Sequence, residues 1–375
     1  MRGLKSNRMP VRRARPSRDA AHFPLPHPLD FDWRFTPETI ALIWNIVRDL
    51  AGPDGGVALL GAPSLARAAD LDLRVGPVTL LERNPLHCSS LNPHVDFVQC
   101  DVLRDPIERG KHSIAIADPP WYEPETIGFL WAAAHLCSVD GHVAVSLPPV
   151  STRPGIQRER ERIRCAAAQS GLEFLYIFEG VLRYRTPFFE TNAMQAARAA
   201  ITHDWRGGDL GVFRRTRRSP GPRPAVADDH HWIERSVGLT RFRLKQKQPA
   251  AFASPVLQSL IPGDILPSVS RRDARRRHAD VWTSGNRIFG CDGTSTLVSV
   301  IEAVAEGQAP EKAVARHLRR PLTAAEASLI ENTARQIRDV VKWEGAEFRR
   351  SGCIPGAIPK LGPVRHRPAS LYRAG

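Results

Sequence analysis

The sequence predicts an α/β protein with a doubly wound, mostly parallel sheet, followed by an extra, largely helical and basic C-terminal region. The first observation is that short apolar runs alternate with helix-length segments from about residue 57 to residue 203. Such alternation is typical of a parallel sheet with helices on both faces. The second observation is that the alternation stops near residue 203, where arginine, proline and glycine become frequent. The chain therefore divides into two regions.

The first expected element is a helix before the sheet. Thr36 can cap its N-terminus, and Pro37 suits its first turn. Apolar residues then recur at helical spacing up to Leu50, and Gly52 followed by Pro53 ends the pattern. This helix is expected to lead directly into the first strand.

The strands and helices that follow are expected from short apolar runs and from amphipathic segments. Strands are expected in the stretches 56–63, 77–84, 95–102, 113–120, 141–149 and 172–180, with a seventh strand at 191–201. Helices are expected at 64–73, 126–137, 155–171, 294–307 and 322–348.

Charge and composition set the expected domain limits and partners. The 375 residues carry a net charge of +14, which favours an acidic partner such as nucleic acid. The expected parts are a disordered basic arm (1–30), a folded domain (31–203), a basic Pro/Gly-rich linker or loop (204–235), an accessory module that can bind nucleic acid (236–350) and a flexible tail (351–375).

Cysteine usage indicates a reduced, cytoplasmic protein. The chain has six cysteines, and none of their spacings is that of a CxxC motif or a zinc site. We therefore expect no metal site. No run of about 18 apolar residues is present in the sequence, so we also expect no membrane span.

Polar or small residues follow the ends of four successive predicted strands. They are Gly61-Ala62-Pro63-Ser64, Glu82, Asp101 with Val102, and Asp118. Ligands of open parallel sheets bind outside these carboxyl ends, where a carboxylate can accept hydrogen bonds from ribose hydroxyls. The sequence has no GxGxxG motif and no P-loop lysine, so it gives little support for a bound pyrophosphate. The pattern indicates a nucleoside cofactor such as S-adenosylmethionine, although each carboxylate alone also fits a structural turn.

The motif Asp118-Pro119-Pro120-Trp121-Tyr122 is the most informative stretch. Methyl transfer to an exocyclic amine requires that the amine is aligned with the methyl group and that acceptors hold its hydrogens. The Asp118 carboxylate and the Pro119 carbonyl can be those acceptors, and the two prolines keep the turn rigid. A ring of Trp121 or Tyr122 can stack on a base, which contributes about 1–3 kcal/mol. We predict that Asp118, Pro119, Pro120 and Trp121 are the catalytic residues.

The same motif resembles the [D/N]-P-P-[F/Y/W] signature of amino-methyltransferases, and its DPPW form is most similar to the adenine N6 enzymes. Over about residues 31–202 the chain is similar to the N6-adenine methyltransferase-like family, whose eukaryotic members methylate a lysine of elongation factor 1-alpha. The similar stretches are WRFTPETI (33–40), VALLGAPSLA (57–66), LLERNP (80–85), FVQCDV (97–102), IAIADPPW (114–121) and RYRTPFFETN (183–192).

This resemblance implies a Rossmann-like, class I methyltransferase fold and roles for further residues. Phe35 and Thr36 would lie near the methionine end of the cofactor. Arg183, Arg185 and Asn192 would bind substrate at the wall of its pocket. The lysine branch prefers Tyr or Phe after the two prolines, whereas this chain has Trp, and residues 204–375 have no counterpart in the family.

Several functions remain open on the sequence. The favoured one is methyl transfer from S-adenosylmethionine to adenine N6 in DNA or RNA. The alternatives are a protein lysine methyltransferase, a non-catalytic methyltransferase-like protein that binds nucleic acid, and, less favoured for so basic a chain, transfer to a polyamine or small metabolite. Residues 271–287 either contact phosphates while Trp282 stacks on a base, or form a solvated basic loop around a core tryptophan.

Overall fold

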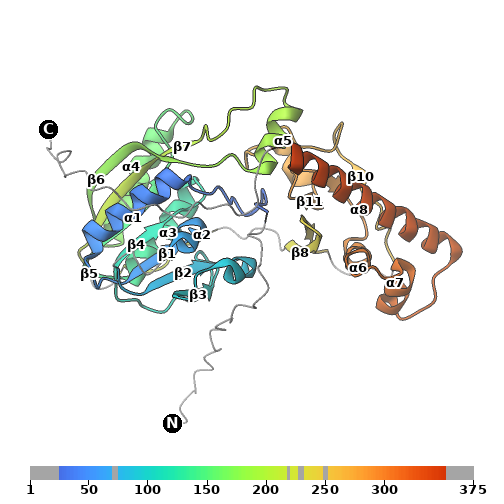
Figure 1. Cartoon of the computed structure of the whole chain (residues 1–375), viewed down its shortest axis with the longest axis horizontal. Helices are drawn as coiled ribbons and strands as arrows, with labels where there is room; N and C mark the ends of the chain where they lie inside the picture. The colour runs from blue at the N-terminus through green and yellow to red at the C-terminus, as the bar shows by residue number, and fades with distance from the viewer. Residues whose placement is uncertain (1–24, 70–74, 218–219, 227–231, 248–251, 352–375) are drawn as a thin grey trace, which may run out of the picture.

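The computed structural model describes residues 25–69, 75–217, 220–226, 232–247 and 252–351. Two units lie side by side (Figure 1). We call residues 25–226 the N-terminal unit and residues 232–351 the C-terminal unit. Each unit has its own sheet and its own apolar core.

A seven-stranded mixed sheet forms the centre of the N-terminal unit, with the strand order β3-β2-β1-β4-β5-β7-β6. Strand β7 is antiparallel to both β5 and β6, while β1 to β5 pair in parallel. This is the topology of class I methyltransferases, so the predicted Rossmann-like α/β class is confirmed. The strands are β1 (Val57–Leu60), β2 (Val78–Glu82), β3 (Val95–Gln99), β4 (His112–Ala117), β5 (Cys137–Leu147), β6 (Leu172–Arg183) and β7 (Gly207–Arg215).

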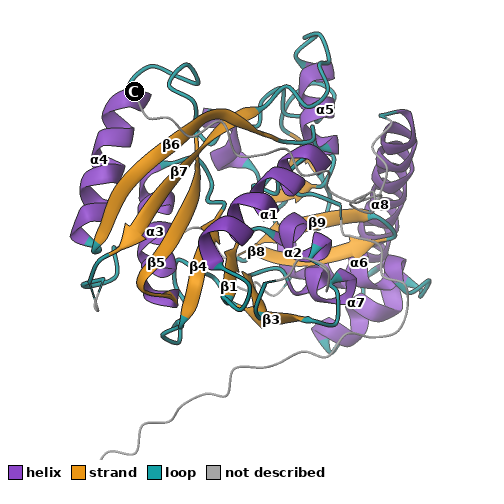
Figure 2. Ribbon diagram, turned by 60° about the vertical axis from the view of Figure 1, so that its left-hand side comes forward, coloured by secondary structure: helices purple, strands orange, loops and turns teal. Residues whose placement is uncertain are grey.

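Helices cover both faces of this sheet because its central strands are apolar on both sides (Figure 2). In β1, Val57 and Leu59 belong to one core, whereas Ala58 and Leu60 belong to the other. Successive strand residues point to opposite faces, so the continuous apolar run requires cover on both. Helices α1 (Pro37–Ala51) and α2 (Pro63–Ala68) lie over the first core, and α3 (Glu123–Leu136) and α4 (Ile156–Gln169) lie over the second.

The prediction of a strand at 191–201 is wrong. This segment contributes to helix α5 (Phe188–Ala196), and the seventh strand is β7 instead. The segment is rich in Ala with Met and Gln, which favour helices. Strand β7 lies within 204–235, the stretch expected to be a linker or loop, and its middle residues are buried.

The C-terminal unit combines helices with a second sheet, which was not expected. The five strands are antiparallel and have the order β10-β12-β11-β9-β8. No helix among the residues that the structure describes is long and apolar enough to span a membrane. The elements are β8 (Trp232–Val237), β9 (Thr240–Lys245), β10 (Gln258–Ser259), β11 (Val281–Thr283), β12 (Ile288–Gly290), the 3-10 turn η3 (Ala274–His278), α6 (Thr294–Ala305), α7 (Pro310–Leu318) and α8 (Ala324–Arg350).

Residues 25–34 connect the two units, although residues 1–30 were expected to be a disordered arm. Leu25 and His27 are buried, and His27 Nε2 lies 3.2 Å from the Trp282 carbonyl oxygen. Asp30 forms ion pairs with Arg241 at 2.5 Å and Arg243 at 2.6 Å. These contacts come from elements more than 200 residues away, so no local pattern indicates them. Residues 1–24 of the predicted arm, and 352–375 of the predicted tail, lie outside the described residues.

Candidate active site

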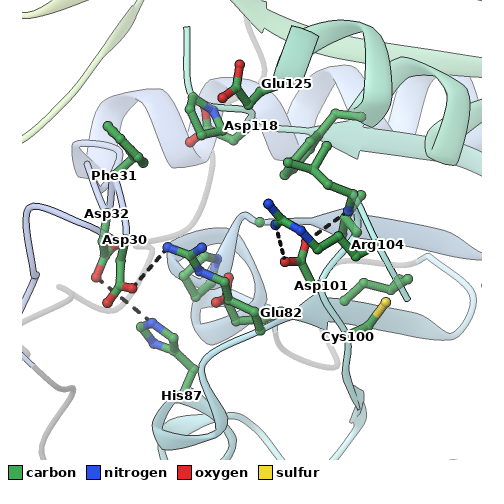
Figure 3. A pocket seen from close by; sticks show the side chains of 18 of the residues that line it. Asp30, Phe31, Asp32, Glu82, His87, Cys100, Asp101, Arg104, Asp118 and Glu125 are labelled. Carbon is green, nitrogen blue, oxygen red and sulfur yellow. Dashed lines mark hydrogen bonds and ion pairs between the residues drawn. The ribbon is translucent and has the colours of Figure 1, made fainter. Parts of the chain in front are cut away.

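A pocket lies outside the carboxyl ends of β1 to β4, where the sequence places the candidate cofactor residues (Figure 3). We call it the strand-end pocket. Segment 30–33 closes one side, and Arg271 of the C-terminal unit reaches the pocket beside Phe31, with its guanidinium 5.5 Å from the centroid of that ring. The predicted residues among its lining are Gly61, Pro63, Glu82, Asp101, Val102 and Asp118.

Four other predicted cofactor residues are not part of the lining of this pocket. Ala62 and Ser64 are buried at the start of α2. Thr36 caps α1 and accepts a hydrogen bond from Thr39 N, as expected for the helix. Phe35 packs against the Tyr184 ring, with 4.7 Å between the centroids.

Gly61 allows the chain to turn tightly between β1 and α2. Its φ of 62° is in the left-handed region, which glycine adopts without strain. A Cβ at this position would lie 3.0 Å from the Phe129 ring and 3.4 Å from the Asp118 carbonyl oxygen. The backbone of this turn therefore borders the pocket directly, as a bound nucleoside would require.

Carboxylates dominate the strand-end pocket, in contrast to the basic chain as a whole. Burial raises the pKa of Glu82 to about 7, although Asn84 N donates a hydrogen bond to its carboxylate. Asp101 accepts hydrogen bonds from Leu103 N at 3.0 Å and from Arg104 at 2.9 Å. Such a pocket suits ribose hydroxyls and cationic groups better than phosphates.

A second pocket adjoins the first and has aromatic walls. We call it the aromatic pocket, and its cavity volume is about 330 Å³. It shares Phe31, Trp33, Asp118 and Pro120 with the strand-end pocket. Asp118 therefore faces both spaces. Its other lining residues are Pro119, Trp121, Tyr122, Thr152, Arg153, Tyr184, Trp205, Arg206, Val269, Ser270 and Arg272.

Two hydroxyl groups hold the Asp118 carboxylate in place. Ser146 Oγ donates to Asp118 Oδ1 at 2.5 Å, and Tyr184 Oη donates to the same oxygen at 2.8 Å. Burial nevertheless raises the pKa of Asp118 to about 7, and the two hydroxyl donors oppose this rise. A carboxyl group with this pKa can accept a proton near neutral pH.

The Trp121 ring is fixed by contacts on several sides. Its Nε1 donates to Ser146 Oγ at 3.2 Å. Tyr184 meets the ring edge to face, with 5.5 Å between centroids. A Cβ on Gly208 of β7 would lie 2.8 Å from the ring, so glycine is required there for the ring to lie against the strand. Trp121 is therefore a rigid wall of the aromatic pocket.

Arginine side chains stack on the aromatic rings of the same pocket. The Arg206 guanidinium lies 4.4 Å from the Trp33 centroid and 5.1 Å from that of Trp205. Glu190 accepts a hydrogen bond from Arg206 Nη2 at 2.7 Å and another from Trp33 Nε1 at 3.0 Å. The pocket thus presents both flat rings and positive charge.

The predicted substrate residues divide into two groups. Trp121 and Tyr122 line the aromatic pocket, whereas Arg183, Arg185 and Asn192 lie outside the lining of both pockets. Asn192 is buried and donates to the Gly285 carbonyl oxygen at 2.9 Å, so it joins α5 to the C-terminal unit.

Stacking of Trp282 on a base, one of the two interpretations of 271–287, is wrong. The side chain is 1% exposed, and its Nε1 donates to Asn286 Oδ1 at 3.1 Å. Trp282 is therefore a core residue, as the other interpretation has it. Arg276 lies over its outer face, 4.3 Å from the centroid.

Several residues that line or support these pockets were not predicted from the sequence. Ser146 could have been found, because it lies near the carboxyl end of β5 and the strand-end rule applies there too. Tyr184 lies inside the stretch RYRTPFFETN, but only the structure shows its bond to Asp118. Trp205 and Arg206 follow α5 in an irregular stretch and carry no local signal.

Comparisons with known proteins give distant similarities. No protein-family model matches the sequence, and no curated protein matches it. Part of the chain is similar to a mutein of the branched-chain polyamine synthase of Thermus thermophilus, solved with N4-aminopropylspermidine and 5′-methylthioadenosine. The identity is 15%, the TM-score is 0.45, and the match covers 55% of this chain and 64% of that one, less than two thirds of its length.

Two methyltransferase structures also resemble this chain. A candidate RNA methyltransferase from Pyrococcus horikoshii is 16% identical, with a TM-score of 0.39 and coverage of 51% of this chain and 90% of that one. The N-methyltransferase NodS from Bradyrhizobium japonicum is 11% identical, with a TM-score of 0.33 and coverage of 48% and 97%. This chain thus has a distant structural similarity to S-adenosylmethionine-dependent methyltransferases, and no narrower family is identified.

Proposed function

We propose that the protein is an S-adenosylmethionine-dependent N-methyltransferase whose substrate is the exocyclic N6 amine of adenine in a nucleic acid. The observation that carries the proposal is the position of Asp118, which faces both the strand-end pocket and the aromatic pocket. A cofactor in the first pocket and a planar base in the second would meet at this carboxylate.

The residues of the strand-end pocket fit an adenosine with a sulfonium group. Glu82 and Asp101 offer carboxylate oxygens at the strand ends, and the turn at Gly61 leaves room for close approach to backbone. When bound, S-adenosylmethionine supplies an electrophilic methyl group. The acidic lining suits its positive charge.

In the proposed reaction, Asp118 orients the amine and receives its proton. The carboxylate accepts one N–H of the substrate amine, and the Pro119 carbonyl can accept the other, which directs the nitrogen lone pair towards the methyl group. A bound cofactor would supply the methyl group and keep the electrons of its S–C bond, and the proton of the amine would pass to Asp118 and then to water. Trp121 and Tyr122 hold the ring of the base by stacking.

Charge at the aromatic pocket favours a nucleic-acid base over a lysine. Arg153, Arg206 and Arg272 line this pocket. Each forms an ion pair with Glu159 or Glu190, but three cations against two carboxylates leave a positive charge that attracts phosphates and repels an ammonium group. A lysine would also have to lose a proton from a group with an ordinary pKa of about 10.4 before it reacts. Protein lysine remains the second candidate, because aromatic rings such as Trp121 beside a carboxylate can also hold an alkylammonium group.

The proposal is tested with purified protein and adenine-containing oligonucleotides. Calorimetry with S-adenosylmethionine should show binding, and the Glu82→Ala variant should bind more weakly by about tenfold because a ribose contact is lost. After incubation and digestion, N6-methyladenosine or its deoxy form should be detected. Cofactor binding without methylated adenine in any oligonucleotide would contradict the substrate, and the absence of cofactor binding would contradict the whole assignment.

A further inference from the structure

The C-terminal unit contributes residues to the pockets of the N-terminal unit. We propose that its segment 268–278, which we call the arginine segment, binds phosphates of a single-stranded nucleic acid. These phosphates belong to the nucleotides next to the one whose base enters the aromatic pocket. This inference rests on the proposed function and extends it, because it assigns a role to a region outside the methyltransferase sheet.

The arginine segment reaches both pockets. Val269, Ser270 and Arg272 line the aromatic pocket, and Arg271 lines the strand-end pocket. The segment belongs to the C-terminal unit, so the aromatic pocket is complete only when both units are present. A strand with one base in this pocket would therefore run past the arginine segment.

The arginine segment is fixed against the DPPW motif. Arg271 N donates to Tyr122 Oη at 3.1 Å, and the Arg271 guanidinium lies 5.1 Å from the centroid of the Tyr122 ring. The same guanidinium forms an ion pair with Glu125, the third residue of α3. The segment therefore has a defined place beside the motif.

The arginine segment is rich in positive charge. Residues 271–278 contain five arginines and a histidine with a single aspartate, Asp273. Arg272 is 60% exposed, and its nearest carboxylate, on Glu159, is 3.5 Å away. Arg275 and Arg277 are exposed as well, and Arg275 forms an ion pair with Asp273 at 2.6 Å. Exposed cations that neutralise phosphates release counterions, which makes the binding depend on salt.

The aromatic pocket suits a base of a single strand better than a base inside a duplex. A base inside a duplex would have to leave its stack before it could enter a pocket walled by Trp121 and Tyr122, which costs a few kcal/mol. A single strand does not have this cost, and aromatic rings with nearby arginines are typical of single-strand sites. RNA and DNA share this chemistry, so both are included in the test.

The test measures binding of fluorescein-labelled single-stranded RNA, single-stranded DNA and duplex DNA by fluorescence anisotropy at several salt concentrations. The full chain is compared with a triple variant, Arg272→Gln/Arg275→Gln/Arg277→Gln. The matched control removes three exposed arginines of α7 and α8, Arg316→Gln/Arg335→Gln/Arg338→Gln. In Figure 1, α7 lies on the far side of the C-terminal unit, and α8 runs from there back to α5.

The triple variant should bind single strands about tenfold or more weakly, and the slope of log K against log salt should fall by about two, which is about 0.7 for each lost phosphate contact. The control variant should retain most of the affinity, and single strands should bind more tightly than duplex. Equal weakening in both variants, unchanged affinity in the triple variant, or preference for duplex would overturn the inference.

A methyl-transfer assay on the same proteins separates this inference from the proposed function. If the wild-type protein methylates adenine in an oligonucleotide and the triple variant has an unchanged KM, the inference fails and the function stands. If the wild-type protein methylates no nucleic acid, the proposed function fails, and the anisotropy data still show whether the arginine segment binds strands.

Discussion

Asp118 lies where the two pockets meet, and the burial that suits it to the proposed reaction also lowers the stability of the fold. Its pKa is raised to about 7, mainly by burial. Since the pKa is about 3.9 in an unfolded chain, the native protein binds more protons than the unfolded protein between about pH 4 and pH 7. The free energy of unfolding therefore falls as the pH rises through this window, and the full penalty is present above about pH 7.

The Asp118→Asn variant should separate the effect of the carboxyl group on methyl transfer from its effect on stability. Methyl transfer should fall by about 100-fold or more, because the amide cannot accept the proton of the amine. The melting temperature at about pH 8 should rise, because a buried charge is removed while Ser146 and Tyr184 keep an acceptor. Thermal unfolding at about pH 5 should show a smaller gain, because the wild-type carboxyl is then protonated. Unchanged turnover would rule out the assigned role of Asp118.

The dependence of kcat/KM on pH should report the same carboxyl group. Activity should rise as Asp118 loses its proton at about pH 7 and should then reach a plateau. The Tyr184→Phe variant lacks one hydroxyl donor that stabilises the carboxylate, so its midpoint should lie at higher pH. Tyr176→Phe, on the more exposed part of β6, is the control and should keep the wild-type midpoint. A midpoint that does not move in Tyr184→Phe would show that the profile reports another group.

Strand β7 positions the Trp121 ring because Gly208 has no side chain. A Cβ at Gly208 would lie 2.8 Å from the ring, so alanine would displace it. The Gly208→Ala variant should raise the KM for the nucleic acid by about tenfold through weaker stacking. Its neighbour Gly207→Ala is the matched control, since that Cβ meets the flexible end of the Arg183 side chain, which can shift, and otherwise makes an ordinary contact with the Leu182 carbonyl oxygen at 3.7 Å. Equal kinetics in the two variants would contradict the role given to β7.

Segment 25–34 joins the units through one buried carboxylate. The side chain of Asp30 is 7% exposed and pairs with Arg241 and Arg243, which hold its pKa well below the usual range. Asp30→Ala should lower the free energy of unfolding by about 3 kcal/mol at neutral pH, because Arg241 and Arg243 are left to share Glu234 and Arg83 also loses its ion pair. The control variant Glu331→Ala breaks an exposed ion pair with Arg338 and should change the free energy of unfolding by less than about 1 kcal/mol. Urea unfolding of both variants measures this difference, and similar values would contradict the linking role of Asp30.

Across the whole molecule, local patterns predicted the parts of the fold that local sequence determines. The stretches predicted as strands overlap β1 to β6, of which β5 and β6 extend to 11 and 12 residues. The strand-end residues Glu82, Asp101 and Asp118 follow from the geometry of parallel sheets. Strand β7 was missed because Gly207 and Gly208 precede a short run with charged residues on either side. The bond from Tyr184 to Asp118 spans 66 residues, and no periodicity indicates it.

The same limit explains why the C-terminal unit was difficult to interpret from sequence. Its arginine-rich stretch looks like a solvated loop, and only the structure shows that Arg271 and Arg272 reach the two pockets. Its small sheet contains strands as short as Gln258–Ser259, which leave no alternating pattern. Contacts between distant segments therefore determine both the packing of the units and the lining of the aromatic pocket.

The most direct test of the central claim follows the methyl group from the cofactor to its acceptor. Purified protein is incubated with tritiated S-adenosylmethionine and, separately, with total RNA, genomic DNA and a protein extract from cells that lack the gene. The proposal predicts label in a nucleic acid, recovered as N6-methyladenine after digestion, and about 100-fold less label with Asp118→Asn. Label found only in a protein band would contradict adenine as the substrate, and its recovery as methyl-lysine after hydrolysis would identify the lysine reaction instead.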